Sequence, residues 1–147
     1  MTAPSSAGVI RCITDAIADA QIKPENIDLV SGHLTATIAD KLEIENWATA
    51  LNLRGEAFPL VNSLKSMVGH SLSAAGSIEA VAAVLQIKHN FAHANINLED
   101  PNPEILKLIG ANNLPVNKVD REINVVAKAN FGFGDVNSCL IISKFNN

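Results

Sequence analysis

The sequence predicts an α/β fold of three layers, in which helices cover a mixed sheet. Segments with the apolar period of helices alternate with short apolar strands along the first 90 residues, a pattern typical of parallel pairing. Two apolar strands near the C-terminus are separated by a short glycine-rich turn and are expected to pair antiparallel. With 147 residues, of which 48% are hydrophobic and 18% charged, the chain is large enough for one core. We therefore expect residues 1–147 to form a single domain.

Three helices are expected. Apolar side chains recur every three or four residues over 9–20, and Ser5 or Ser6 precedes them as a capping residue. Residues 40–51 form the second helix, with carboxylates in its first turns, where the helix dipole favours them. The third runs to about residue 89 and is apolar on nearly every side, so it is expected to be buried.

Strands are expected over 27–30, 58–62, 122–128 and 138–143, and the region after residue 90 is irregular apart from a turn or two of helix within 104–109. The first two strands lead into loops that carry His33 and His70. Ligands of open α/β sheets bind at the carboxyl ends of strands. We therefore expect the two histidines to converge there.

Charge and cysteine content exclude several classes of function. The net charge is −4 and no run of Lys and Arg occurs, which argues against a nucleic-acid partner. No apolar run approaches the roughly 20 residues of a membrane span. Cys12 and Cys139 lie far apart and nothing resembles a secretory leader, so a reduced, cytoplasmic location is expected.

Lys65 and His70 lie on a loop that feeds the apolar helix. Their charges are therefore expected beside a low-dielectric interior, as in an active site. A histidine taken alone is most often a surface residue or a hydrogen-bonded core residue. His33 and His70 are therefore candidates for catalytic residues only when they are considered together. The sequence has no HxxxH or HExxH spacing, and no metal site is expected. The turn at 131–134 lacks the features of a phosphate loop and, read alone, is a hairpin turn.

Three motifs together resemble one known family. His33-Leu34-Thr35-Ala36-Thr37 followed by Asp40 and Glu43 resembles the HGTxT…D..E segment of β-ketoacyl-[acyl-carrier-protein] synthases. Residues 65–70 with 74–79 are similar to their KxxxGH…AAGxxE segment, and residues 130–134 to their NSFGFGG turn. The order and spacing of the motifs agree with the family over essentially the whole chain.

The resemblance implies the thiolase fold, in which two similar α/β halves pack as five layers, this chain being the C-terminal half. The family performs decarboxylative Claisen condensation of malonyl-carrier protein with an acyl thioester, in fatty-acid or polyketide synthesis. No cofactor is implied beyond the phosphopantetheine of the acyl carrier protein. The implied partners are this carrier and the N-terminal half, with a dimer as the complete enzyme.

The resemblance also implies roles for individual residues. His33 and His70 would donate hydrogen bonds to the enolate that forms as malonyl decarboxylates. Lys65 would hold the two histidines by electrostatics and hydrogen bonding, and Glu79 would compensate its charge. The substrate-binding residues would be two threonines that contact pantetheine and two phenylalanines of the closing turn, namely Thr35, Thr37, Phe131 and Phe133. The backbone N–H of Phe133 matches an oxyanion-hole donor, and its ring matches a gate on the acyl pocket.

Three departures from the family pattern bear on these roles. Leu34 replaces a glycine and is expected to reshape the pantetheine tunnel. Asp135 replaces the last glycine of the closing turn and adds a carboxylate near the site. The family's nucleophilic cysteine belongs to the N-terminal half, and neither Cys12 nor Cys139 matches it. The chain alone is therefore predicted to be inactive, and a non-catalytic partner resembling a chain-length factor, or a structural remnant, stays open as an alternative.

Overall fold

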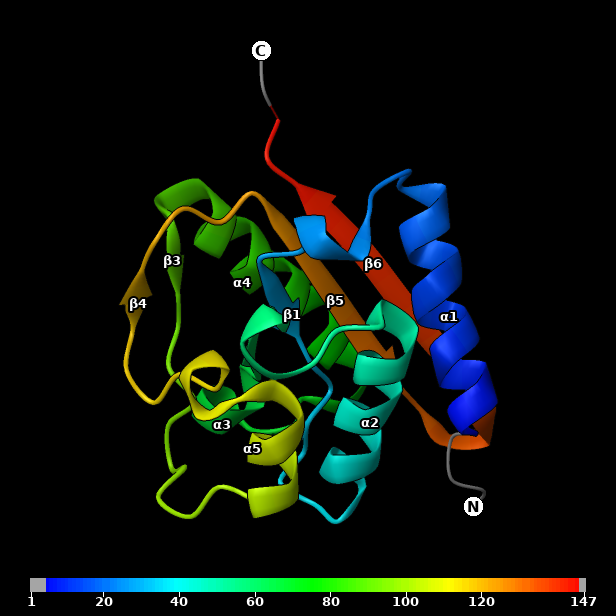
Figure 1. Ribbon diagram of the computed structural model, residues 1–147, viewed down its shortest axis with the longest axis horizontal. Coiled ribbons are helices and arrows are strands. Elements are labelled where there is room, and N and C mark those ends of the chain that lie inside the picture. Colours follow the sequence, from blue (N-terminus) through cyan, green and yellow to red (C-terminus); the bar gives the residue numbers. More distant parts are fainter. Residues whose placement is uncertain (1–4, 146–147) are drawn as a thin grey trace.

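A mixed four-stranded sheet organises the molecule (Figure 1), for which a computed structural model describes residues 5–145. Its strand order is β2-β1-β5-β6, with β1 at Leu29–Ser31, β2 at Leu60–Asn62, β5 at Val125–Phe131 and β6 at Asn137–Ser143. Strand β1 pairs parallel to both β2 and β5, whereas β6 returns antiparallel to β5. The expected mixed sheet and closing hairpin are confirmed.

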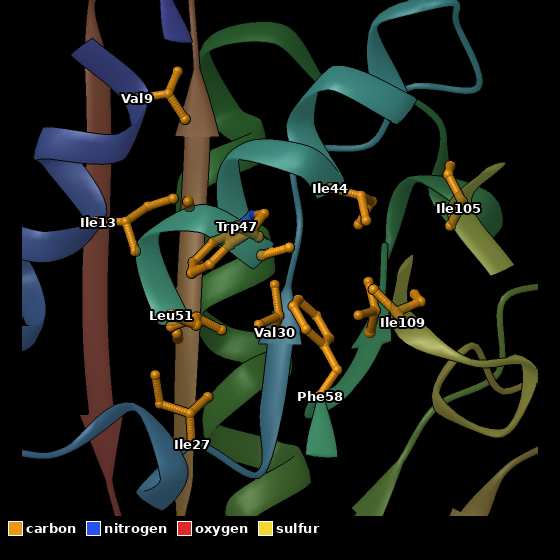
Figure 2. Close-up of a cluster of buried hydrophobic side chains, with 14 of the residues drawn as sticks. Val9, Ile13, Ile27, Val30, Ile44, Trp47, Leu51, Phe58, Ile105 and Ile109 are labelled. Atoms are coloured by element: carbon orange, nitrogen blue, oxygen red, sulfur yellow. The ribbon is translucent and has the colours of Figure 1, made fainter. Parts of the chain in front are cut away.

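Helices cover both faces of this sheet, which gives the expected three layers (Figures 1 and 2). On one face lie α1 at Ser6–Asp19, α2 at Ala39–Leu51 and α5 at Pro103–Ile109. On the other lies α4 at Ala75–His89, which follows the short helix α3 at Lys65–Val68. The expected cap is confirmed, because Ser5 Oγ accepts the N–H of Gly8 at 3.0 Å.

The larger core fills the space between the sheet and the α1–α2 layer (Figure 2). Trp47 and Leu51 of α2 pack with Ile13 of α1 over Val30 of β1, and each is at most 1% exposed. A smaller core between the other face and α4 contains Leu29, Ala83 and Val126. These two cores hold the carboxyl ends of β1 and β2 in fixed positions relative to α4.

The expected burial of α4 holds on its sheet side, and its far side is exposed, as follows for an apolar helix in a half that lacks its partner half. Its side chains Ile78, Val81, Val84 and Leu85 are 41–61% exposed. Among residues 5–145 the sheet covers only one face of α4, because the α1–α2 layer lies on the opposite side of the sheet. An apolar helix face is therefore exposed, which we call the α4 outer face.

The remaining differences concern strands after residue 90. Strand β5 starts three residues later than expected and extends through Phe131, because the Asp28 carboxylate takes up the N–H groups of Asn124 and Val125 at its start. The pair β3 at Phe91–Ala92 and β4 at Val119–Asp120 was not expected. Strands of two residues are too short to show a period in the sequence.

The turn between β5 and β6 is tied to the start of α1. Asp135, in the left-handed region with φ of 60°, accepts the N–H of Ser5 at 3.1 Å and its hydroxyl at 3.0 Å. Asn137 Nδ2 donates to the same carboxylate at 2.7 Å. A Cβ on Gly8 would overlap this carboxylate in its present position, so glycine leaves room for these contacts. We call this group of contacts the Asp135 clasp.

Within the described residues, none of the helices is both long and apolar enough to cross a membrane.

Candidate active site

The loop that carries His33 follows β1 and is held by two carboxylates of α2. Glu43 accepts the backbone N–H of His33 at 2.7 Å and that of Leu34 at 2.9 Å. Asp40 accepts the N–H groups of the next three residues at 3.0–3.3 Å. The D..E part of the first motif thus has a structural role, because it fixes the backbone on which His33 and the two threonines stand.

Glu43 is a buried carboxyl group. Burial raises its pKa to about 7, although the two backbone hydrogen bonds from His33 and Leu34 act in the opposite direction. The group that orients His33 therefore exchanges its proton near neutral pH.

His70 follows β2 and α3 across Gly69, which has a φ of 73°. Its Nδ1 lies 3.0 Å from the backbone nitrogen of Leu72. A backbone amide only donates, so Nδ1 accepts and the proton of the neutral ring resides on Nε2.

The structure brings His33 and His70 together, as expected from the strand ends. Their ring centroids are 5.2 Å apart, with the planes at 80°. Burial, together with the neighbouring Lys65 and His70, lowers the pKa of His33 to about 4. His33 is therefore neutral at neutral pH and retains one N–H with which to donate.

Lys65 and Glu79 form the ion pair expected from the motif, and both are at most 9% exposed. Glu79 has a second cation, since Lys128 Nζ of β5 lies 3.1 Å from its Oε2. Asn130 Nδ2 also donates to Oε2, at 2.8 Å. Burial alone would raise the pKa of Glu79, but the hydrogen bonds from these three side chains lower it.

Two grooves meet at His70 and the two threonines. The first, which we call the histidine groove, has a volume of about 850 Å³ and is lined by both histidines and by Asn130, Phe131 and Phe133. The second, about 570 Å³, is lined by Lys65, by residues 95–98 and by α5, and we call it the loop groove. Thr35, Thr37 and His70 line both, so the expected substrate-binding threonines lie where the grooves join.

The two phenylalanines of the closing turn differ in their surroundings. Phe131 is buried, and its ring centroid lies 6.4 Å from that of His33. Phe133 is 70% exposed and lines the mouth of the histidine groove. All eight residues predicted as site residues thus lie in or beside one connected region.

Lys128 and the contact of Asn130 with His33 were not predicted from the sequence. Lys128 is 2% exposed and directly follows the apolar residues 125–127. A lysine within such a run is a signal of a buried, paired charge. Its pKa is lowered by burial, against the opposing effect of Glu79.

Metal and cysteine chemistry find no support in the described part of the chain. Residues 5–145 contain no group of three or more His, Cys, Asp or Glu side chains that could hold a metal ion. Burial raises the pKa of Cys139 to about 12, so its thiol stays protonated at neutral pH. Burial also raises the pKa of Cys12.

Known proteins resemble the chain in both sequence and structure. The family model described as the C-terminal domain of β-ketoacyl synthases matches residues 1–99. The chloroplastic 3-oxoacyl-[acyl-carrier-protein] synthase II of Arabidopsis thaliana is 39% identical over 144 residues, covering 97% of this chain and 26% of that protein.

Two solved structures share the fold over 99% of this chain, each at 31% identity. The ishigamide ketosynthase/chain length factor superposes with a TM-score of 0.89 over 34% of its chain. The second structure is a type II polyketide synthase acyl-carrier protein in complex with its ketosynthase. One chain of this complex superposes with a TM-score of 0.85, over 35% of its length. The chain thus spans about a quarter to a third of the length of these three relatives.

Proposed function

The chain belongs to the β-ketoacyl synthase family, as its C-terminal domain, and we propose that it serves decarboxylative Claisen condensation of malonyl-acyl carrier protein with an acyl thioester. The closeness of His33 and His70 carries this proposal. Two imidazoles whose ring centroids lie 5.2 Å apart provide two hydrogen-bond donors in one groove. An enolate oxygen is the charge that such donors stabilise.

The surrounding groups support this chemistry. Lys65 and Lys128 supply positive charge beside the rings, which disfavours protonation of His33 and favours a developing oxyanion. Glu79 keeps these two buried ammonium groups paired. The charged residues thereby tune the histidines, which make the direct contacts.

The two connected grooves fit a long thioester substrate. We assign the junction at Thr35 and Thr37 to the phosphopantetheine arm, the only prosthetic group in the proposal. The apolar histidine groove then receives the acyl chain, with Phe133 at its mouth and the Phe133 N–H as an oxyanion donor. Leu34 packs against the core, and its bulk, where the family has glycine, would narrow the path of the arm.

Two partners follow from the proposal. The first is an acyl carrier protein, by analogy with the ketosynthase complex described above. The second is an N-terminal synthase half, which supplies the acyl-accepting cysteine and covers the α4 outer face. The complete enzyme, made of both halves, then forms a dimer. Exposed apolar surface of this kind marks an interaction site.

The test is reconstitution with an N-terminal half from a related synthase. We expect the two halves to associate and to release carbon dioxide from malonyl-carrier protein, while the 147-residue chain alone condenses nothing. A variant at Val81, which is 61% exposed on the α4 outer face, tests whether the N-terminal half binds to this face. Val81→Lys should weaken association because it would bury an unpaired charge, whereas Lys88→Ala at the exposed end of α4 should not.

Association is measured by light scattering, and turnover by carbon dioxide release. A chain that stays a monodisperse monomer and does not bind the N-terminal half would contradict the proposed association of the two halves. Association without decarboxylation would favour the alternative in which the chain is a non-catalytic partner shaping another subunit's pocket. The ketosynthase/chain length factor structure gives that alternative its basis, but the joint presence of His33, Lys65 and His70 favours the catalytic role.

A further inference from the structure

We propose that Asn130, held in place by Glu79 and Lys128, fixes the tautomer of His33, so that Nε2–H is the donor that this imidazole offers to the substrate oxygen. The identity of the substrate oxygen that accepts this hydrogen bond rests on the proposed function. The tautomer itself is a property of the chain and can be measured without any reaction.

The amide orientation of Asn130 follows from its neighbours. Asn130 Nδ2 lies 2.8 Å from Glu79 Oε2, and an ionised carboxylate can only accept a hydrogen bond. The same nitrogen lies 3.4 Å from His33 Nδ1. An amide NH₂ has two hydrogens, one for each of these atoms, so Nδ1 accepts and the ring proton is on Nε2.

Lys128 holds the oxygen on which this arrangement depends. Lys65 contacts Oε1 of Glu79, whereas Lys128 and Asn130 both contact Oε2. Lys128 and Asn130 are two residues apart on β5, so their side chains emerge on the same face of the sheet. The two lysines divide the carboxylate between them, and Oε2 stays turned toward Asn130.

Helix α4 lies beside the other end of the amide. A Cβ on Gly76 would lie 3.2 Å from Asn130 Oδ1 and 3.7 Å from Lys128 Nζ. The first of these distances is tighter than ordinary van der Waals contact. Glycine at position 76 therefore allows α4 to approach β5 closely without displacing the Asn130 amide.

Charged groups face His33 from each element around it. Lys65 of α3, Glu79 of α4, Lys128 of β5 and the neighbouring His70 all influence its protonation. Glu43 of α2 contacts only its backbone N–H. The two ammonium groups of Lys65 and Lys128 act in the same direction as the Asn130 contact, because each disfavours a second proton on the His33 ring.

The test is ¹⁵N-histidine NMR of the 147-residue chain. For His33 we expect a protonated Nε2, an unprotonated Nδ1 and a titration midpoint near pH 4. Asn130→Asp keeps the shape of the side chain but replaces the NH₂ donor by an acceptor, so the ring proton should move to Nδ1 and the midpoint should rise. Asn97→Asp, an exposed asparagine in the loop groove, should leave both signals unchanged.

His70 provides the internal control, since Leu72 sets its tautomer independently of Asn130. An Nδ1–H tautomer of His33 in the unaltered chain, or an unchanged His33 in Asn130→Asp with His70 intact, would overturn the proposal. If Asn130→Asp loses the folded His70 signal, Lys128→Met takes its place. An Nδ1–H tautomer of His33 in that variant supports the role of Lys128 in holding Oε2, and an unchanged Nε2–H tautomer contradicts it. Correct tautomers without decarboxylation after reconstitution would instead count against the proposed function.

Discussion

Replacing His33 by alanine in the reconstituted synthase is expected to slow malonyl decarboxylation by about 10²–10³-fold, the usual effect of removing one oxyanion donor. His70→Ala should have an effect of the same order, because the two rings lie 5.2 Å apart and face the same groove. The double variant should lose less than the product of the two single effects, since residues that act as a unit are not additive. Release of carbon dioxide from malonyl-carrier protein gives the rate directly.

His89→Ala is the matched control. This histidine ends α4 and is exposed, far along the helix from Glu79, so its loss should leave the rate unchanged. A rate within twofold of the unaltered enzyme for both His33→Ala and His70→Ala would show that the histidines do not stabilise the transition state.

The largest expected effect on stability comes from Glu79→Gln. The change leaves Lys65 and Lys128, which are 9% and 2% exposed, without their common counter-ion. Removing one partner of a buried ion pair typically lowers the free energy of unfolding by about 3–5 kcal/mol. Denaturant unfolding of the 147-residue chain, compared with the unaltered chain, measures the change.

Two further variants separate charge from packing. Glu45→Gln removes a glutamate whose ion pair with Lys41 is about 43% exposed, so the expected loss is below about 1 kcal/mol. Adding Lys128→Met to Glu79→Gln removes one of the uncompensated cations and should recover part of the lost stability. A loss for Glu79→Gln no larger than that for Glu45→Gln would mean that the buried lysines do not need this carboxylate.

The parts of the fold that depend on local pattern were predictable from the sequence. The periods of α1 and α2, the apolar strands and the glycine-rich turn all appear where the pattern indicates, within a few residues. The meeting of His33 and His70 was predictable as well, because both follow parallel strands. A shared sheet edge brings such residues together whatever the sequence distance between them.

The parts that depend on register and on neighbouring layers were not predictable. Lys128 faces Glu79 because the pairing of β5 with β1 and β6 sets which of its side chains turn toward α4. The apolar sequence of α4 indicated a buried helix, but it could not show which layer covers each of its sides; the sheet covers one side and the other is exposed. The contact from Asn130 to His33 needs both the β5 register and the close approach at Gly76.

The Asp135 clasp has a consequence for the order of folding. It joins residues 130 positions apart, so closing it costs more chain entropy than forming α1 or the β5–β6 hairpin. Contacts of such long sequence separation form after the local ones on which they depend. The clasp is therefore expected to be absent from the folding transition state and to act on the unfolding rate, as a late bond that slows the opening of the domain.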